Sequence, residues 1–245
     1  MAKIDDVVRR IEEFAPLESM EVWDNSGWQI NLGNNETKKI MLALNASFDT
    51  VKQAVNQRCD LLLVHHPLFF EPVKLINQPE VVWAIQNNLQ IYSAHTNLDK
   101  AKDGTSDTLM AKMKKSDFVR YNEFVRVKQF DVPVSVEKLI ENLKKDLGLS
   151  TLRIINQNTK QCVRNIACCA GAGGSLITEL EKSGVDFYVT GDVKYHEALA
   201  AGDIVVIDIG HYDSEKYVVD IFKKILENID IEVVAADEKN VWQVV

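Results

Sequence analysis

The stretch Asp60-Leu-Leu-Leu-Val-His65-His66-Pro67 contains the pattern that decides the fold. Residues 61–64 form a short apolar run, which is typical of a strand buried on both faces of a parallel sheet. Two imidazoles and a proline follow at once, just beyond the expected carboxyl end of that strand. Similar short strands alternate with amphipathic helices on both sides of the stretch, and this alternation predicts an α/β protein.

The alternation occurs twice with the same order. In the first run we expect strands at Ile40–Leu44, Leu61–Val64 and Gln90–Ala94 and helices at Thr50–Arg58 and Val81–Asn87. In the second we expect strands at Asn165–Ala170, Asp186–Thr190 and Ile204–Ile209 and helices at Ser175–Lys182 and His196–Ala201. The order predicts two similar α/β domains, residues 1–125 and 126–245, each with a largely parallel sheet flanked by helices.

Composition narrows the class of protein. The 245 residues are 46% hydrophobic and 26% charged, as in ordinary soluble proteins, and no apolar run reaches the length of about 18 residues that a membrane span needs. The net charge of −8 argues against a dedicated nucleic-acid binder. The four cysteines have no C-x-x-C spacing and the N-terminus is charged, so we expect reduced thiols, no signal peptide and a cytoplasmic location.

All five histidines follow expected strands. Ligands of open parallel sheets bind at the carboxyl edge of the strands, and imidazole is the commonest metal ligand, so the clustering predicts a metal site. His65 and His66 are adjacent, and their rings are expected to diverge toward two neighbouring ions. The alternative is a loop with one core histidine and one solvent-exposed histidine.

Two segments pair a histidine with a carboxylate four residues on. His211 and Glu215 would share one face of a helix, or Glu215 would only complement the helix dipole. His95 and Asp99 have the same spacing, with Asp99 as a metal ligand and His95 as a proton carrier, unless the segment is a simple turn.

Together these residues form a nitrogen and oxygen ligand set, which comprises His65, His66, Asp99, His211 and Glu215. Such a set suits Zn, Fe, Mn, Co or Ni, and two ions bridged by a carboxylate would activate water. Asp192 and His196 follow another expected strand, where they would contact a substrate or merely lie on a helix surface.

Five segments of the chain form recognisable motifs, namely Val64-His65-His66-Pro67-Leu68, Ala94-His95-Thr96-Asn97-Leu98-Asp99, Thr190-Gly191-Asp192-Val-Lys-Tyr-His196, Asp208-Ile-Gly-His211-Tyr-Asp-Ser-Glu215 and Trp23-Asp24-Asn25-Ser26-Gly27. Together these motifs resemble the GTP cyclohydrolase I type 2 homologues, also called Nif-three-like dinuclear metal-binding proteins. The resemblance spans nearly the whole chain. It departs at Trp28, where the family commonly has leucine, and at Asn45, where an aspartate often follows the first strand.

The resemblance implies two interlinked α/β domains with a dinuclear metal site between them, assembled as a toroidal homohexamer. It assigns the five ligands named above to two divalent ions per chain and makes Glu215 the bridge. The leading hypothesis is a metal-dependent hydrolase for a small nucleotide-like substrate, with GTP ring opening as the named reaction and His95 and Glu215 as catalytic residues. The alternatives are a di-metal phosphoesterase and a non-enzymatic, ring-shaped regulatory or interaction protein with structural metals.

Overall fold

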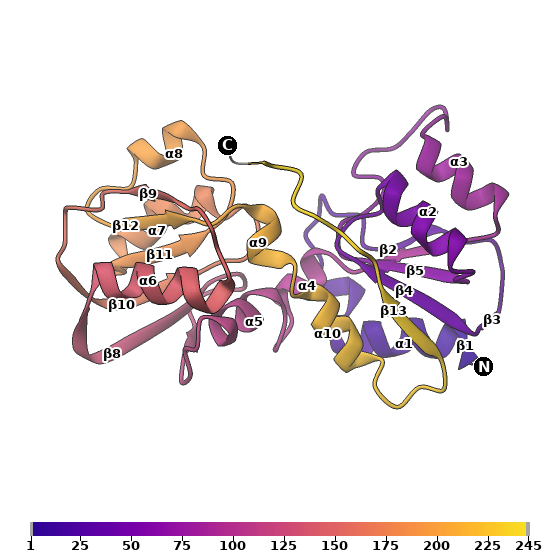
Figure 1. Cartoon of the computed structure of the whole chain (residues 1–245), viewed down its shortest axis with the longest axis horizontal. Coiled ribbons are helices and arrows are strands. Elements are labelled where there is room, and N and C mark those ends of the chain that lie inside the picture. The colour runs from indigo at the N-terminus through magenta and orange to yellow at the C-terminus, as the bar shows by residue number, and fades with distance from the viewer. Residues whose placement is uncertain (1, 244–245) are drawn as a thin grey trace. The chain divides into compact units, whose positions relative to one another are not determined.

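The computed structural model describes residues 2–243, which divide into two compact units (Figure 1). The first unit contains residues 2–104 and Val218–Lys239, and the second contains Thr105–Tyr217 and residues 240–243. The units are therefore interlinked, because the chain returns to the first unit before it ends. The division lies near residue 104, whereas the sequence pattern placed it near residue 125, because Leu109 and Met110 belong to the core of the second unit.

The first unit contains a five-stranded sheet. Its order is β13 (Glu232–Ala235), β4 (Lys39–Ala43), β5 (Leu61–Val64), β6 (Gln90–Ser93) and β2 (Gly27–Ile30). The strands β13, β4, β5 and β6 are parallel, and β2 pairs antiparallel with β6 at the edge. The three central strands are those that the sequence predicted, while β13 returns from the end of the chain to complete the sheet.

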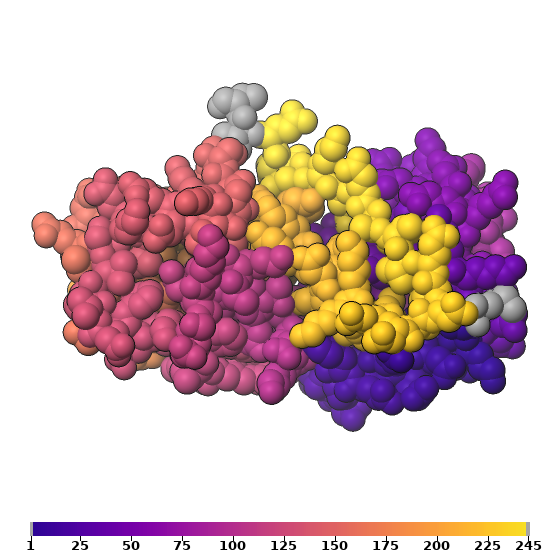
Figure 2. Space-filling view, turned by 60° about the horizontal axis from the view of Figure 1, so that its bottom comes forward, coloured from indigo at the N-terminus to yellow at the C-terminus, as the bar shows by residue number. Residues whose placement is uncertain are grey.

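Helices cover both faces of this sheet (Figure 1). On one face lie α2 (Phe48–Asn56) and α3 (Pro79–Gln86), and on the other lie α1 (Ile4–Phe14) and α10 (Val218–Ile225). Ser47 caps the N-terminus of α2, since its hydroxyl accepts the amide N–H of Thr50 over 3.2 Å. Figure 2 shows the yellow segment that includes α10 packed against the indigo α1, where Arg10 donates to the carbonyl of Glu227 over 2.7 Å. Shorter elements are β1 (Ala2–Lys3), η1 (Leu17–Ser19), β3 (Glu36–Thr37) and α4 (Thr96–Lys100).

The second unit contains a six-stranded sheet whose centre repeats this plan. Its order is β7 (Val119–Arg120), β8 (Arg126–Ser135), β10 (Cys162–Cys168), β11 (Phe187–Thr190), β12 (Val205–Asp208) and β9 (Arg153–Ile155). The central strands β10, β11 and β12 are parallel, and the outer strands pair antiparallel. On one face pack α5 (Thr105–Lys112) and α6 (Val136–Leu147), and on the other η2 (Gly174–Leu176), α7 (Ile177–Lys182) and α8 (Tyr195–Leu199).

The predicted α/β class and the repeated β-α-β-α-β order are therefore confirmed, with β4–β5–β6 and β10–β11–β12 in equivalent order. Because the carboxyl ends of parallel strands meet at one edge, each sheet brings its polar loops together there. Among residues 2–243, no helix has the length and apolar character to cross a membrane. Three of the four free cysteines are buried, and Cys162 is exposed.

Candidate metal centre

His65 follows β5 directly and is fully buried. Its Nδ1–H donates to the carbonyl oxygen of Ala94, the residue after β6, over 2.7 Å. Because a carbonyl only accepts, this bond fixes the tautomer and leaves the lone pair on Nε2. Metal-binding histidines are commonly held in this way by an oxygen acceptor.

A side chain fixes the same tautomer in His66 that a backbone carbonyl fixes in His65. Its Nδ1–H donates to Oδ1 of Asn45 over 2.7 Å, and its amide N–H donates to the carbonyl of Leu44 over 3.0 Å. Asn45 stands where an aspartate was expected from the resemblance, and it still supplies the oxygen that accepts from the imidazole. Asparagine in place of aspartate therefore keeps the hydrogen bond that orients His66.

His95 is oriented by Asp24, which belongs to the loop between the two N-terminal tryptophans. The Nδ1–H of His95 donates to Oδ1 of Asp24 over 2.8 Å. The buried carboxylate also accepts from the amide and hydroxyl of Thr96, the hydroxyl of Ser26 and the amide of Asn25. Burial opposes the charged form, but the hydrogen bonds from His95 and Thr96 hold the pKa of Asp24 far below its usual range.

The first unit thus brings four of the predicted site residues together. Ring centroids lie 5.0 Å apart for His65 and His66, 5.2 Å for His65 and His95, and 5.6 Å for His66 and His95. One nitrogen from each ring lies within 4.8 Å of the others. Asp99, on α4, places Oδ1 3.5 Å from Nε2 of His65.

The second unit supplies the predicted histidine and glutamate pair at the two ends of the short helix α9 (His211–Glu215). Nε2 of His211 lies 2.9 Å from Oε2 of the buried Glu215, as the spacing of four residues predicted. Nδ1–H donates to Oδ2 of Asp192 over 2.8 Å. Burial alone would lower the pKa of His211, but the hydrogen bonds and charges of Glu215 and Asp192 raise it to about 9.

Glycine at position 171 allows the backbone to approach this pair. Gly171 follows β10 with a φ of +70°, and a Cβ there would collide with the carboxylate of Glu215. Its amide N–H donates to the hydroxyl of Ser214 over 2.8 Å, which ties the turn to α9. The turn after β10 therefore helps to fix the position of Glu215.

The two predicted substrate contacts lie on the surface of the second unit. His196 is exposed on α8, and Asp192 is half-exposed with a φ of +52°. The structure gives Asp192 a contact that the sequence did not reveal, namely the hydrogen bond that orients His211.

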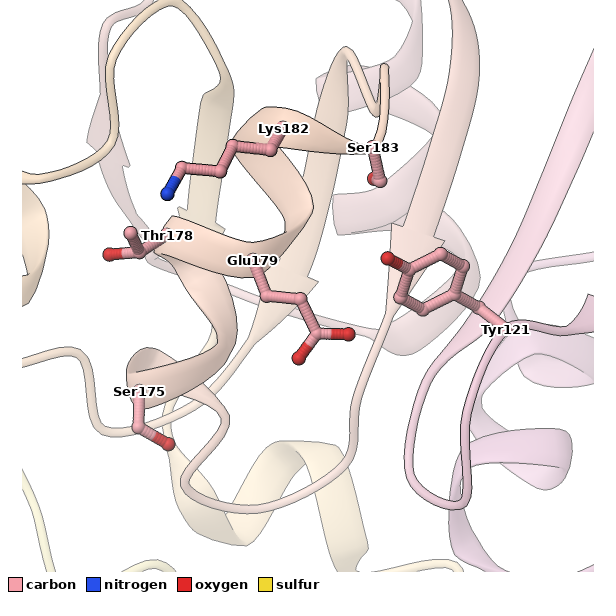
Figure 3. A pocket seen from close by; sticks show the side chains of 6 residues that line it. All are labelled: Tyr121, Ser175, Thr178, Glu179, Lys182 and Ser183. Atoms are coloured by element: carbon pink, nitrogen blue, oxygen red, sulfur yellow. The ribbon is translucent and has the colours of Figure 1, made fainter.

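The second unit also has an open hollow of about 550 Å³ beside α7 (Figure 3). It is lined by Tyr121, Ser175, Thr178, Glu179, Lys182 and Ser183, and Figure 3 shows Glu179 and Tyr121 facing each other across it. None of the predicted site residues lines it. The hollow therefore does not belong to the candidate metal centre.

The chemistry of the donors fits divalent transition metals. Each of the four histidines at the sheet edges donates Nδ1–H to an oxygen, so Nε2 is the nitrogen that would bind a metal ion. In His211 the ion would replace the proton that Nε2 shares with Glu215. Carboxylates accompany them in both units, at Asp99 and Glu215. Imidazole and carboxylate donors are the set that Zn, Fe, Mn, Co and Ni accept.

The fold and these side chains define an α/β protein with candidate metal ligands at the carboxyl edges of its sheets. The chain belongs to the Duf34/NIF3 (NGG1p interacting factor 3) family, which it matches over residues 2–241. The resemblance noted from the sequence is thereby confirmed.

Individual relatives are similar over nearly their full length. A protein of Clostridium acetobutylicum named GTP cyclohydrolase 1 type 2 homolog is 30% identical, with 92% of this chain and 90% of the relative covered. Helicobacter pylori GTP cyclohydrolase 1 type 2 is 29% identical, with complete coverage of both chains. Among solved structures, reduced HcgD from Methanocaldococcus jannaschii has a TM-score of 0.84 at 29% identity, covering 96% of this chain and 98% of its own.

Proposed function

We propose that this protein binds two divalent transition-metal ions and uses them to hydrolyse a small nucleotide-like substrate. The ligands would be His65, His66 and Asp99 from the first unit and His211 and Glu215 from the second, with Glu215 as the bridge. The observation that carries the proposal is the shared orientation of the histidines, whose Nδ1 atoms all donate to oxygen. The names of the relatives support a cyclohydrolase reaction on GTP as the first candidate.

Bound ions would polarise a substrate oxygen and lower the pKa of water, and five protein ligands for two ions leave coordination positions open. The protein's own contribution beyond binding is proton transfer. His95 is held by Asp24 through Nδ1, so its Nε2 can accept or donate a proton at the edge of the first sheet. Glu215 would hold the ions, while the substrate contacts assigned to His196 and Asp192 stay predictions.

Two variants separate metal binding from proton transfer. His95→Gln is expected to lower turnover of GTP by about 10²- to 10⁴-fold with metal content retained, as for loss of a general acid or base. Glu215→Gln is expected to lose both metal and turnover. Asp203→Asn serves as the control, because this exposed carboxylate of the second unit has no place in the site.

The assay covers GTP, other nucleotides and a generic phosphoester with protein loaded with Mn²⁺ or Zn²⁺. Cleavage of the phosphoester alone would favour the di-metal phosphoesterase. Full metal occupancy without turnover of any compound would contradict the hydrolase and favour a ring-shaped regulatory protein. Light scattering tests the proposed homohexamer separately.

A further inference from the structure

The last segment of the first unit places a carboxylate beside the histidine loop. After β13, the amide of Ala236 donates to the carbonyl of Leu42 over 2.9 Å. The backbone of Asp237 exchanges two hydrogen bonds with the side chain of Gln53, of 2.8 and 3.1 Å. Hydrogen bonds to β4 and to α2 therefore fix the backbone immediately before Glu238.

Glu238 binds the end of β4 and the residue that holds His66. Its carboxylate accepts the amide N–H groups of Leu44 and Asn45, and Oε1 also accepts Nδ2–H of Asn45 over 3.1 Å. At its other end, the same amide accepts Nδ1–H of His66 through Oδ1 over 2.7 Å. A continuous path thus runs from a carboxylate through a neutral amide to an imidazole.

The order of donors and acceptors along this path has one solution. A carboxylate accepts only, so it fixes Nδ2 of Asn45 toward Glu238 and Oδ1 toward His66. An amide oxygen accepts only, so Nδ1 of His66 carries the proton and Nε2 carries the lone pair. Without the carboxylate, the side-chain amide of Asn45 could rotate by half a turn and present Nδ2–H to His66. His66 would then take the Nε2–H tautomer.

We propose that Glu238 is a positioning residue that sets the tautomer of His66 through Asn45, and so sets how strongly His66 binds a metal ion. The inference rests on the proposed function in that it takes His66 as a ligand. Outer contacts of this kind orient the ligand and raise its basicity, and their loss commonly weakens metal binding about 10- to 100-fold. The C-terminal segment thereby controls a ligand that lies far from it in the sequence.

Glu238→Gln tests the relay because glutamine has nearly the same shape and can donate. A glutamine oxygen can replace only one of the two carboxylate oxygens, and we expect it to keep the shorter bond, from the amide of Leu44. The NH₂ group then faces Asn45, donates to its Oδ1, turns Nδ2 toward His66 and forces the proton onto Nε2. We expect ¹⁵N NMR of histidine-labelled, metal-free protein to show His66 change from the Nδ1–H to the Nε2–H tautomer. Zinc affinity, measured by chelator competition, should fall about 10- to 100-fold.

A double variant distinguishes the relay from simple support of the fold. In Asn45→Asp/Glu238→Gln, the glutamine donates to the new carboxylate, which again accepts Nδ1–H of His66. Both the tautomer and the zinc affinity should return toward wild type. Asp237→Asn is the matched control, since it makes the same charge change one residue away, where only the backbone is bonded to Gln53.

An unchanged tautomer in folded Glu238→Gln, or a double variant that does not recover, would overturn the relay. If Glu238→Gln fails to fold, wild-type protein decides, because finding His66 in the Nε2–H form would overturn the proposal equally. If wild-type protein binds no metal, the proposed function fails, while the tautomer measurements on metal-free protein still test the relay.

Discussion

Asp24→Asn should destabilise the first unit strongly. Both carboxylate oxygens of Asp24 accept a backbone N–H, that of Asn25 on Oδ1 and that of Thr96 on Oδ2. An asparagine offers one acceptor, so either orientation turns an NH₂ group toward one of these amides. The substitution also removes the charge that His95 and two hydroxyl groups bind.

The expected loss in the free energy of unfolding follows from the hydrogen bonds of Asp24. Hydrogen bonds to a charged group contribute about 1.5–3 kcal/mol each, and a buried N–H left without an acceptor costs about 1–3 kcal/mol. Since the hydroxyls can rotate to other acceptors, we expect a total loss of about 3–5 kcal/mol in the free energy of unfolding. In a chain of this size that lowers Tm by about 6–20 °C.

The same carboxylate predicts how stability changes with pH. Its pKa is lower in the folded state than in the unfolded chain, so the folded state binds fewer protons as the medium becomes acidic. The stabilisation is therefore fully present above about pH 4 and is lost as pH falls through the folded-state pKa. The difference between wild type and Asp24→Asn should narrow in acid.

Urea unfolding of metal-free protein, followed at neutral pH and in acid, measures both effects. Asp49→Asn is the control, because Asp49 is an exposed aspartate of the first unit. A neutral-pH loss below about 1 kcal/mol, the size of an average substitution, would refute the assignment of Asp24 as the centre of a buried network.

Three further predictions concern the metal centre. Gly171→Ala should lower the free energy of unfolding by about 1–3 kcal/mol, because alanine is strained at the positive φ of this position. It should also weaken zinc binding, because the added Cβ displaces the carboxylate of Glu215, and an unchanged chelator-competition curve would contradict this. Asp192→Asn should lower the pKa of His211 from about 9, as followed by NMR titration of metal-free protein, and an unchanged titration would show that the contact does not act on the imidazole. Zn²⁺ should stabilise the wild type by about 2.7 kcal/mol at 100 times its Kd, and a Tm independent of metal concentration would count against a specific site.

Local patterns were sufficient to predict much of the fold. The short runs at β5 and β11, each flanked by helical periodicity, indicate buried parallel strands because four mainly apolar residues are enough for a strand and too few for a typical helix. Placing β13 required more, because Glu232–Ala235 is a short strand with two partly buried residues between two exposed ones, and it has no buried apolar run to mark it. Its pairing with β4 depends on a contact between distant parts of the sequence, which no local pattern encodes.

The candidate ligands could be predicted from the sequence, and the groups that orient them could not. His211 and Glu215 are one helical turn apart, so spacing alone predicts their contact. Asp24 and His95, in contrast, are separated by 71 positions and meet only after β2 and β6 pair. The aspartate in its polar turn therefore gave no signal of the imidazole that it binds.

Metal content of protein purified without chelators tests the central claim most directly. Elemental analysis should find two divalent transition-metal ions per chain in the wild type and a clear loss in a His211→Ala/Glu215→Ala variant. Less than one ion per chain, unchanged in that variant, would contradict the dinuclear centre.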